Sequence, residues 1–153
     1  MSRAFVKETD KDTTGLSDRP ISPHRNLVTE AGLAGIESTL ERFETTHRTA
    51  VDNGDRQAAD IALREVRYWK ARRANAEVVK PPEDRSKASF GMTVTLRRED
   101  GREQSFKIVG EDEADPSRGT VSYVSPLARA VLTHGAGATV LIGNSEAVIL
   151  DVQ

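Results

Sequence analysis

Two stretches of this chain place apolar residues at alternating steps of three and four, and no Pro interrupts either stretch. Steps that average 3.5 residues are typical of the seam of an α-helical coiled coil. Between the stretches, Asp52-Asn53-Gly54-Asp55 combines residues that end a helix with one that begins the next. Because the stretches are nearly equal in length and their connection is short, we predict an antiparallel two-helix coiled coil over residues 27–80, with Thr29 as N-cap. The predicted seam comprises Leu33, Ile36, Leu40, Phe43, His47 and Ala50, then Ala59, Ala62, Val66, Trp69, Arg73 and Ala76.

The composition fits a chain in which only part of the length forms a core. Hydrophobic residues make up 37% of the 153 residues and aromatic residues 5%, whereas an apolar share of about 45–50% is ordinary. Residues 1–26 mix both charges with scattered apolar side chains, and Pro20 and Pro23 lie near their end. Because so little apolar surface does not offset the entropy cost of ordering, we predict that residues 1–26 form a disordered tail.

The pattern changes after Pro81-Pro82, which ends the second helix and opens a predicted linker over residues 81–87. From Phe90 onward apolar residues alternate with polar ones, which is the period of β-strands. Ser125 followed by Pro126 is a typical helix start and predicts a helix over residues 127–133. The predicted strands contain Val94 and Leu96; Phe106, Ile108 and Val109; Val121 and Tyr123; residues 140–142; and residues 148–152. We therefore predict an α+β chain whose residues 88–153 form a small antiparallel-sheet domain with one helix.

Several classes of function are excluded by composition. The chain has no Cys, so disulfides, thiolate metal sites and Cys nucleophiles are excluded, and we expect a cytoplasmic protein. No apolar run has the length of a membrane span, and no signal peptide is recognised at the N-terminus, so no membrane partner is expected. The three His residues, His24, His47 and His134, lack metal-ligand spacing, and no catalytic constellation appears. We expect neither an enzyme nor an intrinsic cofactor.

Three charged clusters remain, and each has two interpretations. Carboxylates at the predicted hairpin tip could hold a divalent ion shared with another protein, or could simply favour the turn and the cap. A basic series on the second helix could pair with Glu37, Glu41 and Glu44, or could contact RNA or an acidic protein. The acidic loop over residues 110–116 has the composition of a solvated loop. The tip residues are Asp52, Asp55 and Asp60, and the basic residues are Arg64, Arg67, Lys70, Arg72 and Arg73.

Three ordered series of residues resemble one known family. They are Phe90-Gly91-x-x-Val94-x-Leu96, then Phe106-x-Ile108-Val109-Gly110-Glu111-Asp112-Glu113-Ala114-Asp115, then Gly119-x-Val121-Ser122-x-x-Ser125-Pro126-Leu127-Ala128-x-Ala130-Val131-Leu132. Together they resemble the C-terminal domain of the GreA/GreB transcript cleavage factors almost from end to end. The resemblance implies an FKBP-like fold for residues 88–153, preceded by an antiparallel coiled coil in the place where periodicity predicts one.

The resemblance also implies a partner, RNA polymerase. Members of the family dock their C-terminal domain at the rim of the polymerase secondary channel and insert the coiled coil toward the active site. The docking residues it implies are Glu113, Ala114, Asp115 and Pro116, with Ser125 and Pro126 nearby. It further suggests that the basic helix face contacts nascent RNA or the polymerase, and that the protein is an accessory factor acting through the polymerase active site.

At the hairpin tip the chain departs from the family pattern. Cleavage factors carry an Asp-x-x-Glu pair that helps to hold a Mg²⁺ supplied by the polymerase active centre, but Ala58 stands where the Glu would follow Asp55, and Asp60 is out of register. The arms are also shorter than in typical members by roughly 8–10 residues, or about 12–15 Å of helix. One version of the function stimulates cleavage through Asp52 or Asp55, which would share that Mg²⁺. The other occupies the channel without cleavage, as in the short-coil regulators of nucleoside diphosphate kinase, and the tip favours it.

Two further hypotheses belong to different classes. An FKBP-like binding or isomerase module would need an aromatic pocket, for which the sheet domain offers only Phe90, Phe106 and Tyr123. A protein that pairs with itself through its coiled coil would be a stable dimer in sedimentation. We expect instead a monomeric hairpin, and a stable dimer would argue against it.

Overall fold

The computed structural model describes residues 16–153, so the part of the predicted tail over residues 1–15 lies outside the described residues. The described residues form two compact units. One contains residues 16–24 and Ile36–Asn75, and the other contains Arg25–Gly35 and Ala76–Gln153. The helical hairpin predicted over residues 27–80 is therefore divided, because its first turn and its exit group with the sheet.

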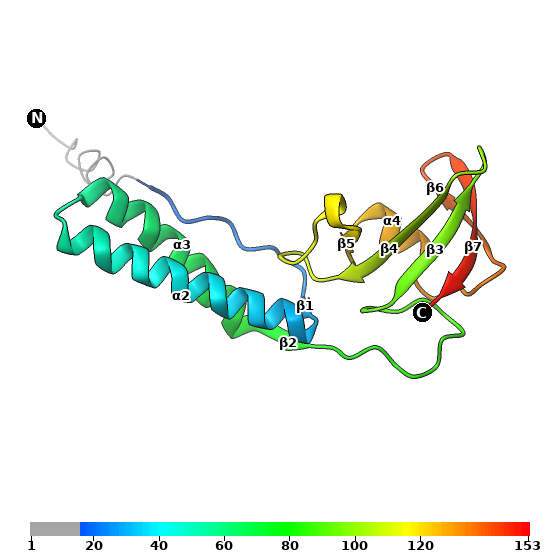
Figure 1. Ribbon diagram of the computed structural model, residues 1–153, viewed down its shortest axis with the longest axis horizontal. Helices are drawn as coiled ribbons and strands as arrows, with labels where there is room; N and C mark the ends of the chain where they lie inside the picture. Colours follow the sequence, from blue (N-terminus) through cyan, green and yellow to red (C-terminus); the bar gives the residue numbers. More distant parts are fainter. Residues whose placement is uncertain (1–15) are drawn as a thin grey trace, which may run out of the picture. The chain divides into compact units, whose positions relative to one another are not determined.

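Two helices joined by a short turn form the hairpin (Figure 1). Helix α2 covers Glu30–Asp52 and helix α3 covers Arg56–Asn75. Thr29 caps α2 as predicted, because its hydroxyl accepts a hydrogen bond from the Gly32 amide at 2.9 Å. Asp55 caps α3 in the same way, its Oδ1 accepting from the Ala58 amide at 3.1 Å. No helix within residues 16–153 is long and apolar enough to cross a membrane.

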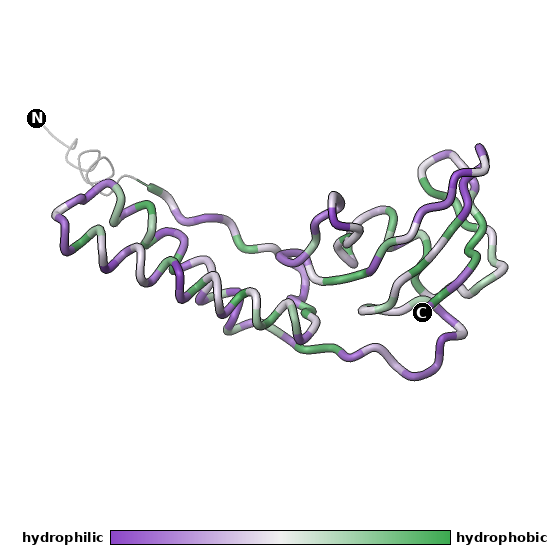
Figure 2. Tube along the Cα trace, in the orientation of Figure 1, coloured by the Kyte–Doolittle hydropathy of each residue, from purple (hydrophilic) through white to green (hydrophobic). Residues whose placement is uncertain are grey.

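The predicted seam between the helices is largely confirmed. Figure 2 shows hydrophobic and hydrophilic residues alternating along both helices, as expected for elements that bury one stripe. The fully buried members of the seam are Ile36, Leu40, Ala50, Ala59, Ala62 and Val66. The prediction was wrong at two positions. Arg73 is exposed, and Arg72 is buried instead, with 1% of its surface accessible. A helical repeat of 3.6 residues permits a step of three as well as a step of four after Trp69. Ala76 lies beyond α3, which ends at Asn75.

Residues 16–24 lie against α3, in contrast to the disorder predicted for residues 1–26. The Arg19 guanidinium lies over the Tyr68 ring at 3.7 Å and forms a 2.6 Å ion pair with Glu65. Asp18 forms a second ion pair, at 2.7 Å, with Arg67. The prediction counted apolar side chains, and it took no account of charged and aromatic contacts of this kind.

The second unit is built on a five-stranded sheet. Its strands are β3 (Thr93–Arg98), β4 (Glu103–Val109), β5 (Thr120–Ser122), β6 (Thr139–Ile142) and β7 (Ser145–Val152), in the spatial order β5-β4-β3-β7-β6. Every neighbouring pair is antiparallel except β4–β5, which is parallel. The short 3₁₀ helix η1 (Pro116–Arg118) precedes β5 in the chain, and helix α4 (Pro126–Val131) follows β5. The predicted α+β class, with a two-helix hairpin followed by a sheet domain, is confirmed.

One face of the sheet carries the core of this unit. In β3, Val94 and Leu96 are fully buried, while their neighbours along the strand are more exposed, so the predicted period of two is confirmed. Ala128 and Val131 of α4 pack on the same face. Helix α4 ends two residues before the predicted residue 133, because Leu132 leaves the helical conformation and Thr133 has a φ of 71°.

A small parallel pair of strands completes the second unit. Strand β1 (Asn26–Val28) pairs with β2 (Ala76–Val78), and sequence patterning predicted neither strand. The Arg25 side chain donates two hydrogen bonds to the Glu77 carboxylate, at 3.1 and 2.7 Å. This contact raises the pKa of Arg25 and lowers the pKa of Glu77. The pairing therefore joins the chain just before α2 to the chain just after α3.

Candidate functional site

The acidic loop follows the end of β4 and leads into η1. Its first turn is closed by the Ala114 amide, which donates to the Gly110 carbonyl at 3.1 Å. Asp115 then caps η1, because its Oδ1 accepts a hydrogen bond from the Ser117 amide at 3.0 Å. The same oxygen also accepts a hydrogen bond from the Ser117 hydroxyl. Pro116 is exposed at the first position of η1. The two residues thus form a fixed, solvent-facing turn that presents a carboxylate beside a proline ring.

The hydrogen bonds at this turn keep the Asp115 carboxyl ionised. The Ser117 hydroxyl is the main cause of a lowered pKa at Asp115, and the Ser117 amide and Arg118 add to it against the cost of desolvation. A carboxylate that is already charged and already oriented loses little freedom when a partner binds it. Asp115 therefore has the properties expected of a recognition group.

The lowered pKa leads to a prediction about pH. Because the folded-state pKa lies below the unfolded value of about 3.9, the ionised carboxylate stabilises the turn above that pH, and the contribution is lost as pH falls through the lowered pKa. An NMR titration should give the Asp115 carboxyl a midpoint below about 3.9. Ser117→Ala should move the midpoint upward. An unshifted midpoint in the unchanged chain would contradict the capped geometry.

Glu113 and Ala114, the other two predicted docking residues of this loop, are only half exposed. The Glu113 carboxylate faces inward, where both of its oxygens lie within hydrogen-bonding distance of the Thr29 hydroxyl, at 2.8 and 2.7 Å. Sequence reasoning missed this contact because 84 residues separate the partners. The only signal in the sequence was Gly32, where a Cβ atom would lie 2.6 Å from the Glu113 Oε2 atom.

Ser125 and Pro126 follow β5 in the sequence and lie at the start of α4. The Ser125 hydroxyl accepts from the Ala128 amide at 3.2 Å, which is the N-cap predicted for it, and Pro126 is exposed. The Tyr123 amide donates to the Val109 carbonyl at 2.9 Å, so the chain leaving β5 lies beside the end of β4 where the acidic loop begins. The two predicted parts of the docking surface therefore flank the same strand pair.

The tip of the hairpin carries the predicted carboxylates. Asp52 is the last residue of α2 and is exposed; Asp55 is exposed and caps α3; Asp60 lies one turn into α3 and is half-buried. Within residues 16–153, no three side chains of the metal-ligating types gather in one place. The donor set at the tip thus fits an ion only if another molecule supplies most of its ligands.

The basic face of α3 is largely engaged in contacts within its own unit. Arg67 pairs with Asp18, and Lys70 approaches Glu44 of α2 at 4.0 Å, in agreement with the interpretation in which the basic residues pair between the helices. Arg72 is buried and Arg64 is half-buried, which leaves Arg73 as the exposed cation at this end of the helix. These contacts favour the interpretation that the basic residues form ion pairs with α2 and with residues 16–24, over the interpretation that they form a continuous nucleic-acid surface.

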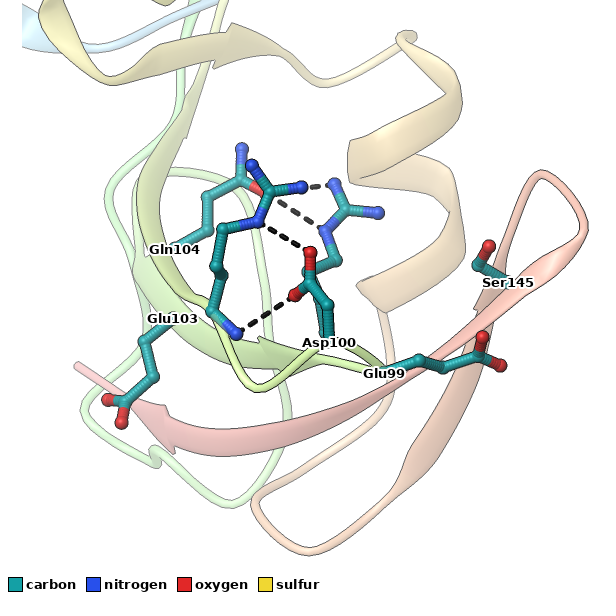
Figure 3. A pocket seen from close by; sticks show the side chains of 7 residues that line it. Glu99, Asp100, Glu103, Gln104 and Ser145 are labelled. Carbon is teal, nitrogen blue, oxygen red and sulfur yellow. Dashed lines mark hydrogen bonds and ion pairs between the residues drawn. The ribbon is translucent and has the colours of Figure 1, made fainter.

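A hollow of about 580 Å³ lies at the turn between β3 and β4 (Figure 3). The Arg102 Nε donates to Asp100 at 2.6 Å, and the Arg98 guanidinium donates to the Gln104 amide oxygen at 2.8 Å. Among the described residues, the buried side-chain atoms without a partner all lie elsewhere. Both arginines therefore pair with residues of the same hairpin, β3–β4, and the hollow is a charged surface turn. It is lined by Arg98, Glu99, Asp100, Arg102, Glu103, Gln104 and Ser145.

Comparison with known proteins gives a consistent family signal. Residues 82–152 match the family described as "Transcription elongation factor, GreA/GreB, C-term". Transcription elongation factor GreB of Neisseria meningitidis serogroup B is 34% identical in an alignment of 154 positions, gaps included, that covers 84% of this chain and 94% of that protein. Transcription elongation factor GreA of Helicobacter pylori (strain Shi470) is 39% identical over 133 residues, covering 83% of this chain and 77% of that protein.

A search of solved structures finds the same group of proteins at lower similarity. The transcription factor Gfh1 is 18% identical, with a TM-score of 0.42 over 86% of this chain and 99% of that chain. A GreA/GreB factor from Nitrosomonas europaea is 20% identical, with a TM-score of 0.41 over 85% of this chain and 98% of that chain.

Proposed function

Because this chain belongs to the GreA/GreB family of transcription elongation factors, we propose that it binds RNA polymerase at the secondary channel and modulates elongation there. The observation that carries the proposal is the capped turn at Asp115 and Pro116, which presents a fixed carboxylate and a proline ring to solvent. The turn lies in the part of the chain that matches the family's C-terminal domain. Its Asp115 and Pro116 are among the docking residues that the resemblance to the family implies.

We propose further that the hairpin occupies the channel without stimulating transcript cleavage. Ala58 stands where an Asp-x-x-Glu pair would place its second carboxylate, and its amide is the group that Asp55 caps. Helix α2 has 23 residues, which corresponds to about 35 Å of reach at about 1.5 Å per residue. The alignment with the Neisseria GreB spans 154 positions but takes in only 84% of this 153-residue chain, so part of the relative has no counterpart here. A shortened hairpin would have that effect.

The sequence and the tip geometry give a direct prediction about cleavage. Added to stalled, backtracked elongation complexes with Mg²⁺, the chain should yield no more shortened RNA than polymerase alone, because a metal-orienting carboxylate is effective only within about an ångström of its place. RNA gel analysis over time measures this. Cleavage well above the polymerase background would contradict the proposal and revive the cleaving version of the function.

Tip variants then separate the two versions. If cleavage appears, Asp52→Ala or Asp55→Ala should reduce it, and full activity in both variants would remove these carboxylates from the mechanism. If it is absent, Ala58→Glu tests whether the missing carboxylate alone is responsible. Activity gained by Ala58→Glu would assign the loss to this residue, and continued inactivity would assign it to the reach of the hairpin.

A further inference from the structure

The Glu113 carboxylate lies at the first turn of α2 and completes a chain of hydrogen bonds there. The Gly32 amide donates to the Thr29 hydroxyl at 2.9 Å, and the Thr29 hydroxyl lies 2.7 and 2.8 Å from the two Glu113 oxygens. A hydroxyl has one proton to donate and can accept in return. Thr29 can therefore cap α2 and donate to Glu113 simultaneously, with the negative charge placed at the helix N-terminus, where the helix dipole favours it.

Two glycines permit this approach. A Cβ atom at Gly32 would lie 2.6 Å from the Glu113 Oε2 atom, so any other residue there would push the carboxylate away. A Cβ atom at Gly110, at the start of the same loop, would lie 2.3 Å from the Leu27 carbonyl oxygen of β1. The acidic loop thus contacts the chain immediately before α2 at one end and the first turn of α2 farther along.

Two residues that follow Glu113 in the acidic loop differ from it. The Glu113 carboxylate contacts Thr29, 84 residues away, whereas the Asp115 carboxylate contacts Ser117 and Arg118 of its own turn, and Pro116 is exposed. A partner that drew the Glu113 carboxylate outward would have to break its contact with Thr29. We propose that Glu113 is a positioning residue that holds β1 and the first turn of α2 on the acidic loop, and that it does not dock on the polymerase. The polymerase part of this inference rests on the proposed function.

Hydrogen exchange tests the contact without any partner. In the full chain, Glu113→Ala should speed exchange of the residue-32 amide about two- to fivefold, since it removes a favourable charge from the cap. Thr29→Val should speed it about five- to thirtyfold, because it removes the cap itself, and Thr29→Ser should restore protection. Unchanged exchange in Glu113→Ala would overturn the proposal.

Gly32→Ala separates positioning from docking, because it displaces the Glu113 carboxylate but leaves it in the loop. Gly35→Ala is the matched control: it adds the same methyl group to the same helix, where nothing lies within 4 Å. If Glu113 positions α2, Gly32→Ala should resemble Glu113→Ala, and both should lower the maximal effect on elongation at saturating factor several-fold, with Gly35→Ala unchanged.

A docking role for Glu113 gives the opposite pattern. Glu113→Ala would raise the concentration of the factor needed for a half-maximal effect on elongation and would leave the maximal effect unchanged. Gly32→Ala would behave as the unchanged chain. This pair of results would overturn the proposal. If the unchanged chain has no effect on polymerase, the proposed function fails, and hydrogen exchange still decides whether Glu113 holds α2. The double variant Gly32→Ala with Glu113→Ala should be no worse than either single variant, because both remove the same contact.

Discussion

Asp115→Asn should weaken the binding of this chain to RNA polymerase by about tenfold or more, as expected when a charged partner is lost from an interface. Asparagine retains the side-chain oxygen that accepts from the Ser117 amide at 3.0 Å, so the turn should keep its shape while losing its charge. The lowered pKa of Asp115 means that the unchanged residue is ionised at neutral pH, so the substitution removes a full charge. Titration of labelled chain with polymerase measures the change.

Asp100→Asn is the matched control for this prediction. Asp100 also lies in an exposed turn of the sheet domain, where it accepts from the Arg102 amide at 2.9 Å and has a lowered pKa, mainly because of that bond. The same loss of charge there should change the dissociation constant less than twofold. Equal weakening by both variants would assign the effect to net charge, and no weakening by Asp115→Asn would remove this residue from the docking surface.

Leu96→Ala should destabilise the sheet domain by about 2–5 kcal/mol, the usual cost of a large cavity in a well-packed core. Leu96 lies on β3 with 0% of its surface exposed, and it belongs to the buried cluster that α4 covers. Since total stabilities are about 5–15 kcal/mol, much of the chain could be unfolded at moderate temperature. Urea denaturation followed by circular dichroism measures the free energy of unfolding.

Leu141→Ala makes the same chemical change on the exposed side of β6, where 64% of Leu141 is accessible. It should alter the free energy of unfolding by less than about 0.5 kcal/mol. A similar loss for the two variants would contradict the assigned faces of the sheet. Because the acidic loop is attached to β4 of the same sheet, Leu96→Ala should also weaken polymerase binding, whereas Leu141→Ala should not.

Sequence predicted the elements whose pattern is local. The steps of three and four through Ile36 and Leu40 locate the buried stripe of α2, and the alternation through Val94 and Leu96 locates the buried face of β3, because burial repeats with the period of each element. Thr29 was identified as a cap for the same reason, since its partner amide is three residues away.

Sequence failed where the contact joins distant residues or depends on charge. The short strand β1 is defined by its pairing with β2, about 50 residues away, and three residues carry too little pattern to identify a strand. Arg19 lies on Tyr68 through a cation–π contact that a count of apolar residues ignores. Glu113 was assigned to docking from the resemblance, and its contact with Thr29 could not be deduced without the fold.

Site-specific cross-linking from the hairpin tip tests the central claim most directly. The natural chain has no Cys, so Asn53→Cys provides a single attachment point for a photoreactive group at the exposed turn between α2 and α3, and Leu141→Cys provides one on β6. In complexes with elongating polymerase, the tip probe should cross-link to the interior of the secondary channel, the β6 probe should not, and adding Asp115→Asn should reduce the yield. A tip probe that reaches no part of the channel at saturating polymerase would contradict the account.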